Sequence, residues 1–267
     1  MLWWTLTRVR KIFYNSLDGT RLCGILYDPK LNARKHLVLA HGITSDKDEG
    51  DVFVKAASAL VAQGYTVLRF DFRGHGESKG RSNDMTLTGE FLDLIASIRR
   101  VNNSDSKSQV GVLAASFGAG PTLMFASIYQ TILSAIVLWN PVLDYEKTFL
   151  KPKSAWAGSY FNDAGYRSLR SKGYLMLDDF KIGKTLVEEM SSIRPFLLLK
   201  QASCPILTIH GDHDSKVPYE VSKEYATCSA GNDFVTLEGA DHGFPTIKDL
   251  ETAIEKSIEW FDRHLQG

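Results

Sequence analysis

Short apolar runs alternate with amphipathic stretches along most of the 267-residue chain. The apolar runs predict buried strands, and apolar residues spaced three and four positions apart predict helices that pack against them. The predicted strands are Arg10 to Asn15, Arg21 to Tyr27, His36 to Ala40, Thr66 to Phe70, Gln109 to Ala115, Ala135 to Trp139, Pro205 to His210 and Phe234 to Leu237. The predicted helices are Val52 to Gln63, Thr88 to Val101, Phe117 to Tyr129, Val221 to Thr227 and a last helix from about Leu250 to Leu265. This alternation predicts an α/β fold with a mostly parallel central sheet flanked by helices.

The alternation stops between Leu143 and about Gln201, where aromatic residues are frequent among lysines and arginines and no buried strand is evident. We therefore expect a core formed by residues 1–142 and 202–267, and a small inserted lid of helices and loops at 143–201 that covers the strand ends. Four lid aromatics are candidate substrate-binding residues, namely Trp156, Tyr160, Tyr166 and Tyr174.

The charge and the composition of the chain limit the classes of partner that it is expected to bind. The chain has 31 basic and 31 acidic side chains, which gives no reason to expect nucleic acid and favours a small-molecule partner. Its three cysteines lack the paired spacing of a zinc or redox motif. No run reaches membrane-spanning length and no secretory signal pattern is present, so we expect a cytoplasmic protein. Trp3 and Trp4 could pack on the body, form a subunit contact or touch a lipid surface, and a homodimer stays open.

Ser116 lies between a predicted strand and a predicted helix, among small residues. This is the setting of the nucleophile elbow, G-x-S-x-G, a strained turn that exposes a serine hydroxyl at a sheet edge. Ala114 replaces the first glycine of that pattern, and Gly118 supplies the second. The alternative is an ordinary helix start, because serine caps helices well.

A nucleophilic serine needs a base and a carboxylate that orients the base. Asp214 and His242 each follow a later predicted strand, on the edge where Ser116 is expected, and in the chain order Ser, Asp, His of α/β-hydrolases. Asp212 is a competing acid that could instead hold the turn through local backbone bonds. The crowding of His210, Asp212, His213 and Asp214 also allows a metal site, but serine chemistry already accounts for that loop and we expect no metal.

Backbone N–H groups must stabilise the oxyanion that forms when the serine attacks. The residue after the nucleophile, Phe117, and the residue after the His41-Gly42 pair, Ile43, are the candidates. His75 could suggest a catalytic role, but we interpret its loop as structural, with Asp71 and Arg73 able to pair and to brace neighbouring loops.

Together these motifs resemble the α/β-hydrolase superfamily. They are His41-Gly42, Asp71 to Ser78, the serine turn, Gly211 with Asp214, Val217 and Pro218, and Gly239 with His242. The short lid and the stretches 41–47 and 69–78 are most similar to the feruloyl or cinnamoyl esterase group. The resemblance implies an α/β-hydrolase fold and a serine carboxylesterase that cleaves aryl or short acyl esters without a cofactor. An acyl thioesterase, a monoacylglycerol lipase or a small serine peptidase of the same fold are alternatives, and a binding module without turnover is a further one.

Overall fold

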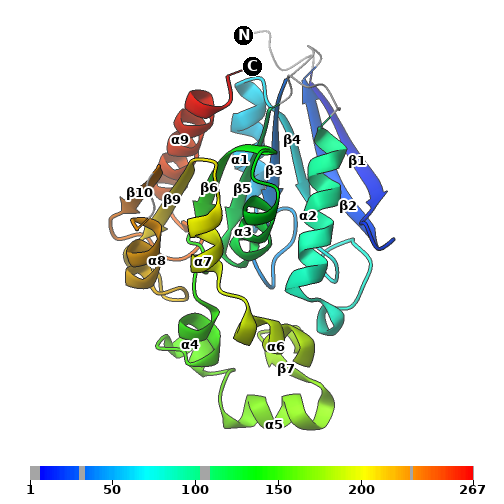
Figure 1. The fold of residues 1–267 in the computed structure, drawn as a ribbon, viewed down its shortest axis with the longest axis vertical. Helices are drawn as coiled ribbons and strands as arrows, with labels where there is room; N and C mark the ends of the chain where they lie inside the picture. The colour runs from blue at the N-terminus through cyan, green and yellow to red at the C-terminus, as the bar shows by residue number, and fades with distance from the viewer. Residues whose placement is uncertain (1–6, 30–33, 103–108, 229–230, 267) are drawn as a thin grey trace.

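An eight-stranded sheet runs through the middle of the molecule (Figure 1). The computed structural model describes residues 7–29, 34–102, 109–228 and 231–266, so Trp3 and Trp4 lie outside the described residues. The strands, in spatial order, are β1 (Thr7–Asn15), β2 (Arg21–Pro29), β4 (Thr66–Phe70), β3 (Lys35–Ala40), β5 (Gln109–Ala115), β6 (Leu133–Trp139), β9 (Ile206–Gly211) and β10 (Asn232–Leu237). Strand β2 is antiparallel to β1 and β4, and the other neighbours are parallel. The predicted fold class is therefore confirmed.

Helices cover both faces of the sheet (Figure 1). They are α1 (Val52–Ala62) and α9 (Ile247–His264) on one face, and α2 (Leu87–Val101), α3 (Ala119–Ile128), α7 (Pro195–Gln201) and α8 (Tyr219–Ala226) on the other. Alternate residues of a strand point to opposite faces, so Leu37 and Leu39 pack with α1 and α9, while Val38 and Ala40 pack with α2 and α3. Because both faces are buried, the parallel strands are continuous apolar runs. No helix in the described ranges is long and apolar enough to cross a membrane.

The segment after β6 departs from the prediction in one respect. It contains the π-helical turn Glu146–Leu150, α4 (Ala155–Gly158), α5 (Asp163–Lys172), β7 (Tyr174–Leu177), β8 (Phe180–Gly183) and α6 (Lys184–Ser192). Figure 1 shows α4, α5, α6 and β7 grouped beyond one end of the sheet. The expectation that this segment contains only helices and loops is wrong, because β7 and β8 pair as an antiparallel hairpin with Leu175, Leu177 and Ile182 buried.

Helix α7 also falls within residues 143–201, yet it packs against α3. Its Leu199 is buried in the same hydrophobic cluster as Leu123 of α3 and Ile136 of β6.

Candidate active site

Backbone strain is concentrated in the loops that follow the parallel strands. Among the described residues, seven non-glycine residues have a positive φ. Six of them lie in the loops after β3, β5, β6 and β10, namely Thr44, Glu49, Asp51, Ser116, Asn140 and Phe244. Such conformations cost energy and gather at functional sites, so this edge of the sheet is the candidate site.

Ser116 occupies the strained turn that the sequence predicts. Its φ is 51°, and a short 3-10 turn from Ser116 to Gly118 leads from β5 into α3. A Cβ at Gly118 would lie 2.5 Å from the Ala40 carbonyl oxygen, so only glycine lets the turn approach the end of β3 this closely. Ala114 is fully buried in β5, where the sheet accommodates its methyl group.

The loop after β3 passes beside the nucleophile. A Cβ at Gly42 would lie 3.1 Å from Ser116 Cβ and 3.6 Å from Ser116 Oγ. The next residue is Ile43, one of the two predicted oxyanion donors, and its backbone N–H makes no hydrogen bond within the described part of the chain. Ile43 and the second predicted donor, Phe117, have buried side chains in one hydrophobic cluster.

His41 fixes the orientation of this loop. The Phe72 N–H donates to His41 Nε2 at 2.9 Å, so the ring proton is on Nδ1, which donates to the Gly42 carbonyl at 2.8 Å. Burial lowers the pKa of His41 to about 4, which keeps the ring neutral and preserves this tautomer. Because the C=O and N–H of a trans peptide point in opposite directions, the bond to the Gly42 carbonyl also sets the direction of the Ile43 N–H.

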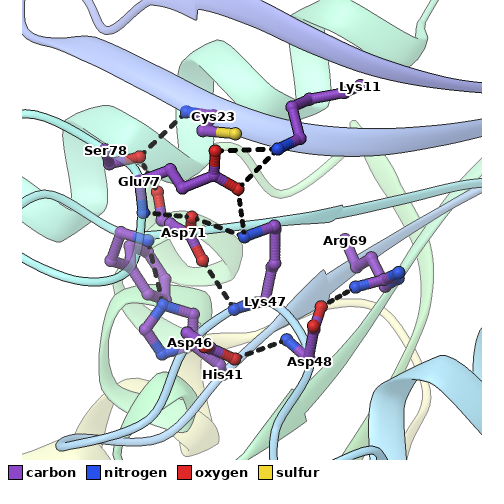
Figure 2. A network of polar contacts seen from close by, with 11 residues as sticks. Lys11, Cys23, His41, Asp46, Lys47, Asp48, Arg69, Asp71, Glu77 and Ser78 are labelled. Atoms are coloured by element: carbon purple, nitrogen blue, oxygen red, sulfur yellow. Dashed lines mark hydrogen bonds and ion pairs between the residues drawn. The ribbon is translucent and has the colours of Figure 1, made fainter.

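A buried ion pair joins the loop after β3 to the loop after β4 (Figure 2). Lys47 Nζ lies 3.1 Å from Asp71 Oδ2, and the two side chains are 9% and 0% exposed. The Asp71 carboxylate also accepts from the Lys47 N–H at 2.7 Å and the Glu77 N–H at 2.8 Å. Glu77 in turn pairs with both Lys47 and Lys11 of β1. The network holds the loop that contains the predicted oxyanion donor.

Asp71 and Arg73 therefore have separate partners. Arg73 Nη2 lies 2.8 Å from Asp93 Oδ1 in α2, and Nη1 lies 2.7 Å from Asp18 Oδ2. The buried His75 ring is stacked on Phe180 of β8 with centroids 4.5 Å apart. The expected pairing of Asp71 with Arg73 is therefore wrong, because each side chain pairs with a residue of another segment.

Asp214 lies beside His242. Asp214 Oδ2 accepts from His242 Nδ1 at 2.8 Å, and Oδ1 accepts from the backbone N–H groups of Lys216 at 2.9 Å and Val217 at 2.8 Å. Burial opposes ionisation of Asp214, but hydrogen bonds from His210 and His242 outweigh it and hold the pKa of this carboxyl well below its usual range. The ionised carboxylate keeps the His242 proton on Nδ1 and leaves Nε2 as a base.

The competing interpretations of this loop find other roles for its residues. Asp212 Oδ1 accepts from the Gly239 N–H at 2.7 Å, which ties the two loops together. His213 is exposed, and His210 Nε2 contacts Asp214 Oδ2 at 3.0 Å. In the described ranges no group of three or more His, Cys, Asp or Glu side chains is arranged to hold a metal ion.

The structure brings the acid and the base together and places the nucleophile on the same sheet edge. Among the described residues, Ser116 Oγ and the His242 ring make no hydrogen bond. Proton transfer from the serine therefore requires the two side chains to come within hydrogen-bond distance of each other. The loop that carries His242 contains Gly239 and Gly243, both at positive φ.

The four lid aromatics predicted to bind substrate differ in their placement. Trp156 is half-buried, and Lys216 Nζ lies over its ring, 5.2 Å from the centroid, which links the lid to the Asp214 loop. The other three make contacts inside the segment 143–201: the Tyr160 hydroxyl with Asp178, the Tyr166 hydroxyl with the Leu150 carbonyl, and the Tyr174 ring with Lys181.

Two aromatics that sequence reasoning did not select lie nearer the serine turn. The Phe117 ring is 5.2 Å from the Tyr145 ring and 6.0 Å from the Phe149 ring, and both partners are fully buried. Their spacing of four residues, which places two side chains on one face of a helical turn, was the available signal.

Glu49 is a second residue that the sequence did not mark. Its Oε2 accepts from the Gly42 N–H at 2.6 Å, and Oε1 would lie 3.6 Å from a Cβ at Gly42. Burial raises the pKa of Glu49, while the Gly42 N–H and the His242 ring oppose that rise. A second carboxylate thus lies near the nucleophile and the base.

Comparison with known proteins finds hydrolases that are similar to this chain. The model of a hydrolase family described as Serine aminopeptidase, S33, matches residues 32–176. The chain is 26% identical over 132 residues to a monoacylglycerol lipase of Mycolicibacterium smegmatis, which covers 49% of this chain and 46% of the lipase. The match thus spans less than half of that lipase.

Two solved structures share the fold. Est1E from Butyrivibrio proteoclasticus with bound ferulic acid is 24% identical, with a TM-score of 0.80 and coverage of 95% of this chain and 99% of that chain. An esterase from Pyrococcus furiosus is 20% identical, with a TM-score of 0.73 and coverage of 97% and 92%. The architecture of this chain is that of the α/β-hydrolases.

Proposed function

We propose, because this chain belongs to the serine aminopeptidase S33 family of α/β-hydrolases, that it is a serine carboxylesterase. Its proposed substrates are small acyl or aryl esters, including feruloyl- or cinnamoyl-like esters. One observation supports this most strongly: a strained serine on the sheet edge where a buried carboxylate orients a histidine. That arrangement supplies nucleophile, base and orienting acid, which is the minimum for acyl transfer.

In the proposed mechanism Ser116 Oγ attacks the ester carbonyl while His242 Nε2 takes its proton. The backbone N–H groups of Ile43 and Phe117 stabilise the oxyanion, and Asp214 stabilises the imidazolium. His242 then gives the proton to the leaving alcohol, and an acyl-Ser116 ester remains. Water attacks this ester with His242 again as base, which releases the acid and restores the serine.

The substrate proposal draws on the lid and on the relatives. Buried aromatics adjoin Phe117, which suits a planar or apolar acyl group. The ferulic acid bound to Est1E favours an aryl acid, and the match to a monoacylglycerol lipase favours a fatty acyl ester as the second candidate.

The test combines one variant and one substrate panel. Ser116→Ala should fold like the wild type and lose at least about a thousandfold in turnover of p-nitrophenyl acetate. Undiminished turnover would defeat the assignment. Relative kcat/KM values for aryl esters, monoacylglycerols, acyl thioesters and aminoacyl anilides should rank aryl or short acyl esters first. A thioester or anilide ranked first would replace esterase by thioesterase or peptidase.

A further inference from the structure

His210 is a buried histidine that the mechanism above does not use. It belongs to β9, pairs in register with Thr236 of β10, and has a side chain with no exposure to solvent. Its ring packs edge-on against Tyr219, with centroids 5.7 Å apart. Burial of a polar ring at such a position costs folding free energy unless the ring is hydrogen-bonded.

The one hydrogen bond of this ring goes to the proposed catalytic acid. Asp214 Oδ2 lies 3.0 Å from His210 Nε2. An ionised carboxylate can only accept, so the proton of His210 is on Nε2. The other nitrogen, Nδ1, is buried without a hydrogen-bond partner among the described residues. An apolar side chain would avoid that unpaired atom, and the contact with Asp214 is what a histidine adds at this position.

Asp214 Oδ2 is shared between two imidazoles. It accepts from His210 Nε2 and from His242 Nδ1, while the backbone N–H groups of Lys216 and Val217 occupy Oδ1. With all four donors in place the carboxylate cannot rotate without losing bonds. A donor on Oδ2 also draws negative charge away from the oxygen that faces His242, and this weakens the attraction between that oxygen and an imidazolium.

Other charged groups face the same pair. The Glu49 carboxylate attracts a proton on His242 from the loop after β3. The Asp241 carboxylate accepts from the backbone N–H groups of His242 at 2.6 Å and Ser215 at 2.8 Å, not from the imidazole ring. The Lys216 ammonium lies over the Trp156 ring instead. His210 is thus the one side chain besides His242 that donates to Asp214 in the described structure.

We propose that His210 is a positioning residue of this site: its Nε2–H fixes the Asp214 carboxylate and moderates the negative charge that His242 meets. The proposal rests on the proposed function, in which His242 is the base. Without the donor, Asp214 Oδ2 carries more negative charge toward His242, and the imidazolium form of that ring is stabilised relative to the neutral form.

The experiment compares four variants with wild type. His210→Leu and His210→Met remove the donor, and His210→Gln keeps a donor at a similar distance along the side chain. Thr208→Val is the matched control, because Thr208 is buried two residues earlier in β9 and makes no bond to Asp214. NMR titration of the His242 ring, in the Ser116→Ala background, and the pH profile of kcat/KM are measured for each folded variant.

Loss of the donor should raise the pKa of His242 and move the acid limb of kcat/KM upward by about 0.5 to 1 pH unit. His210→Gln and Thr208→Val should stay within about 0.2 pH unit of wild type, which is less than about a twofold change in proton affinity. An unchanged His242 titration in a folded His210→Leu or His210→Met variant would overturn the proposal, as would an equal shift in Thr208→Val. The NMR titration needs no turnover, so it can overturn the role of His210 while the esterase assignment stands. Conversely, absence of esterase activity would leave the titration result interpretable.

Discussion

Replacing Lys47 by Met should destabilise the protein far more than replacing Lys11 by Met. Both lysines pair with a carboxylate in the network of Figure 2, but their surroundings differ. The Lys47 and Asp71 side chains are 9% and 0% exposed, whereas Lys11 and Glu77 are 49% and 45% exposed. Methionine preserves most of the packing of the lysine stem in either place.

The magnitude follows from what each variant leaves behind. Removal of one partner of a buried pair costs about 3–5 kcal/mol, because the other charge stays buried without compensation. Asp71 keeps its two backbone donors in the Lys47→Met variant, so we take the lower end, about 3 kcal/mol. At about 2–4 °C per kcal/mol, the Tm should fall by about 6–12 °C. Lys11→Met removes an exposed pair and should cost less than about 1 kcal/mol.

Urea unfolding and thermal scans of both variants test this. Combining Lys47→Met with Asp71→Asn should be less damaging than the sum of the two single changes, since the double variant buries no unpaired charge. Equal losses in Lys47→Met and Lys11→Met would refute the reasoning, because burial would then make no difference to the pair.

Three further predictions concern the site and its surroundings. Gly42→Ala should lower kcat by about 100-fold or more, because the added Cβ would press on Ser116 and displace the adjacent oxyanion donor. Steady-state kinetics of a variant with unchanged Tm would show this loss, and a near-normal kcat would contradict it. Glu49→Leu should reduce kcat by about tenfold, because a hydrogen bond to a charged acceptor is worth about 1.5–3 kcal/mol and leucine offers no acceptor to the Gly42 N–H. Glu49→Gln keeps an acceptor and should retain most of the activity. Equal kcat values for the two variants would contradict this role of Glu49. His75→Phe should make folding less sensitive to acid. Burial lowers the pKa of His75 to about 3, so the unfolded chain binds more protons below about pH 6.5, and stability is lost as the pH falls through that window. The wild type should lose about 2 kcal/mol at pH 5 through this group, a loss absent from His75→Phe in urea titrations; parallel pH curves for the two proteins would count against it.

The sheet could be predicted from the sequence because its strands are buried on both faces. β4 and β5 have the predicted ends, Thr66–Phe70 and Gln109–Ala115. The loops that bear Ser116, Asp214 and His242 follow from the same pattern, since a parallel sheet collects its carboxyl ends at one edge. The lid hairpin was missed because its strands have four residues each and its turn has Asp178 at φ 52°, without the glycine that usually marks such a turn.

Side-chain pairs between residues far apart in the sequence could not be predicted either. Asp71 and Arg73 are close neighbours of opposite charge, yet Asp71 pairs with Lys47 and Arg73 with Asp93. Likewise no spacing rule shows that His210 shares an oxygen of Asp214 with His242. Which side chains pair depends on how the loops pack once the sheet has formed, and the pattern of residues along the sequence does not determine that packing.

Fluorophosphonate labelling with intact-mass and peptide analysis tests the central claim most directly. We expect the wild type to gain one phosphonyl group on Ser116 and to lose esterase activity in proportion, and Ser116→Ala to remain unlabelled. An unlabelled wild-type enzyme that still turns over esters, or a label on another residue with Ser116 untouched, would contradict the account.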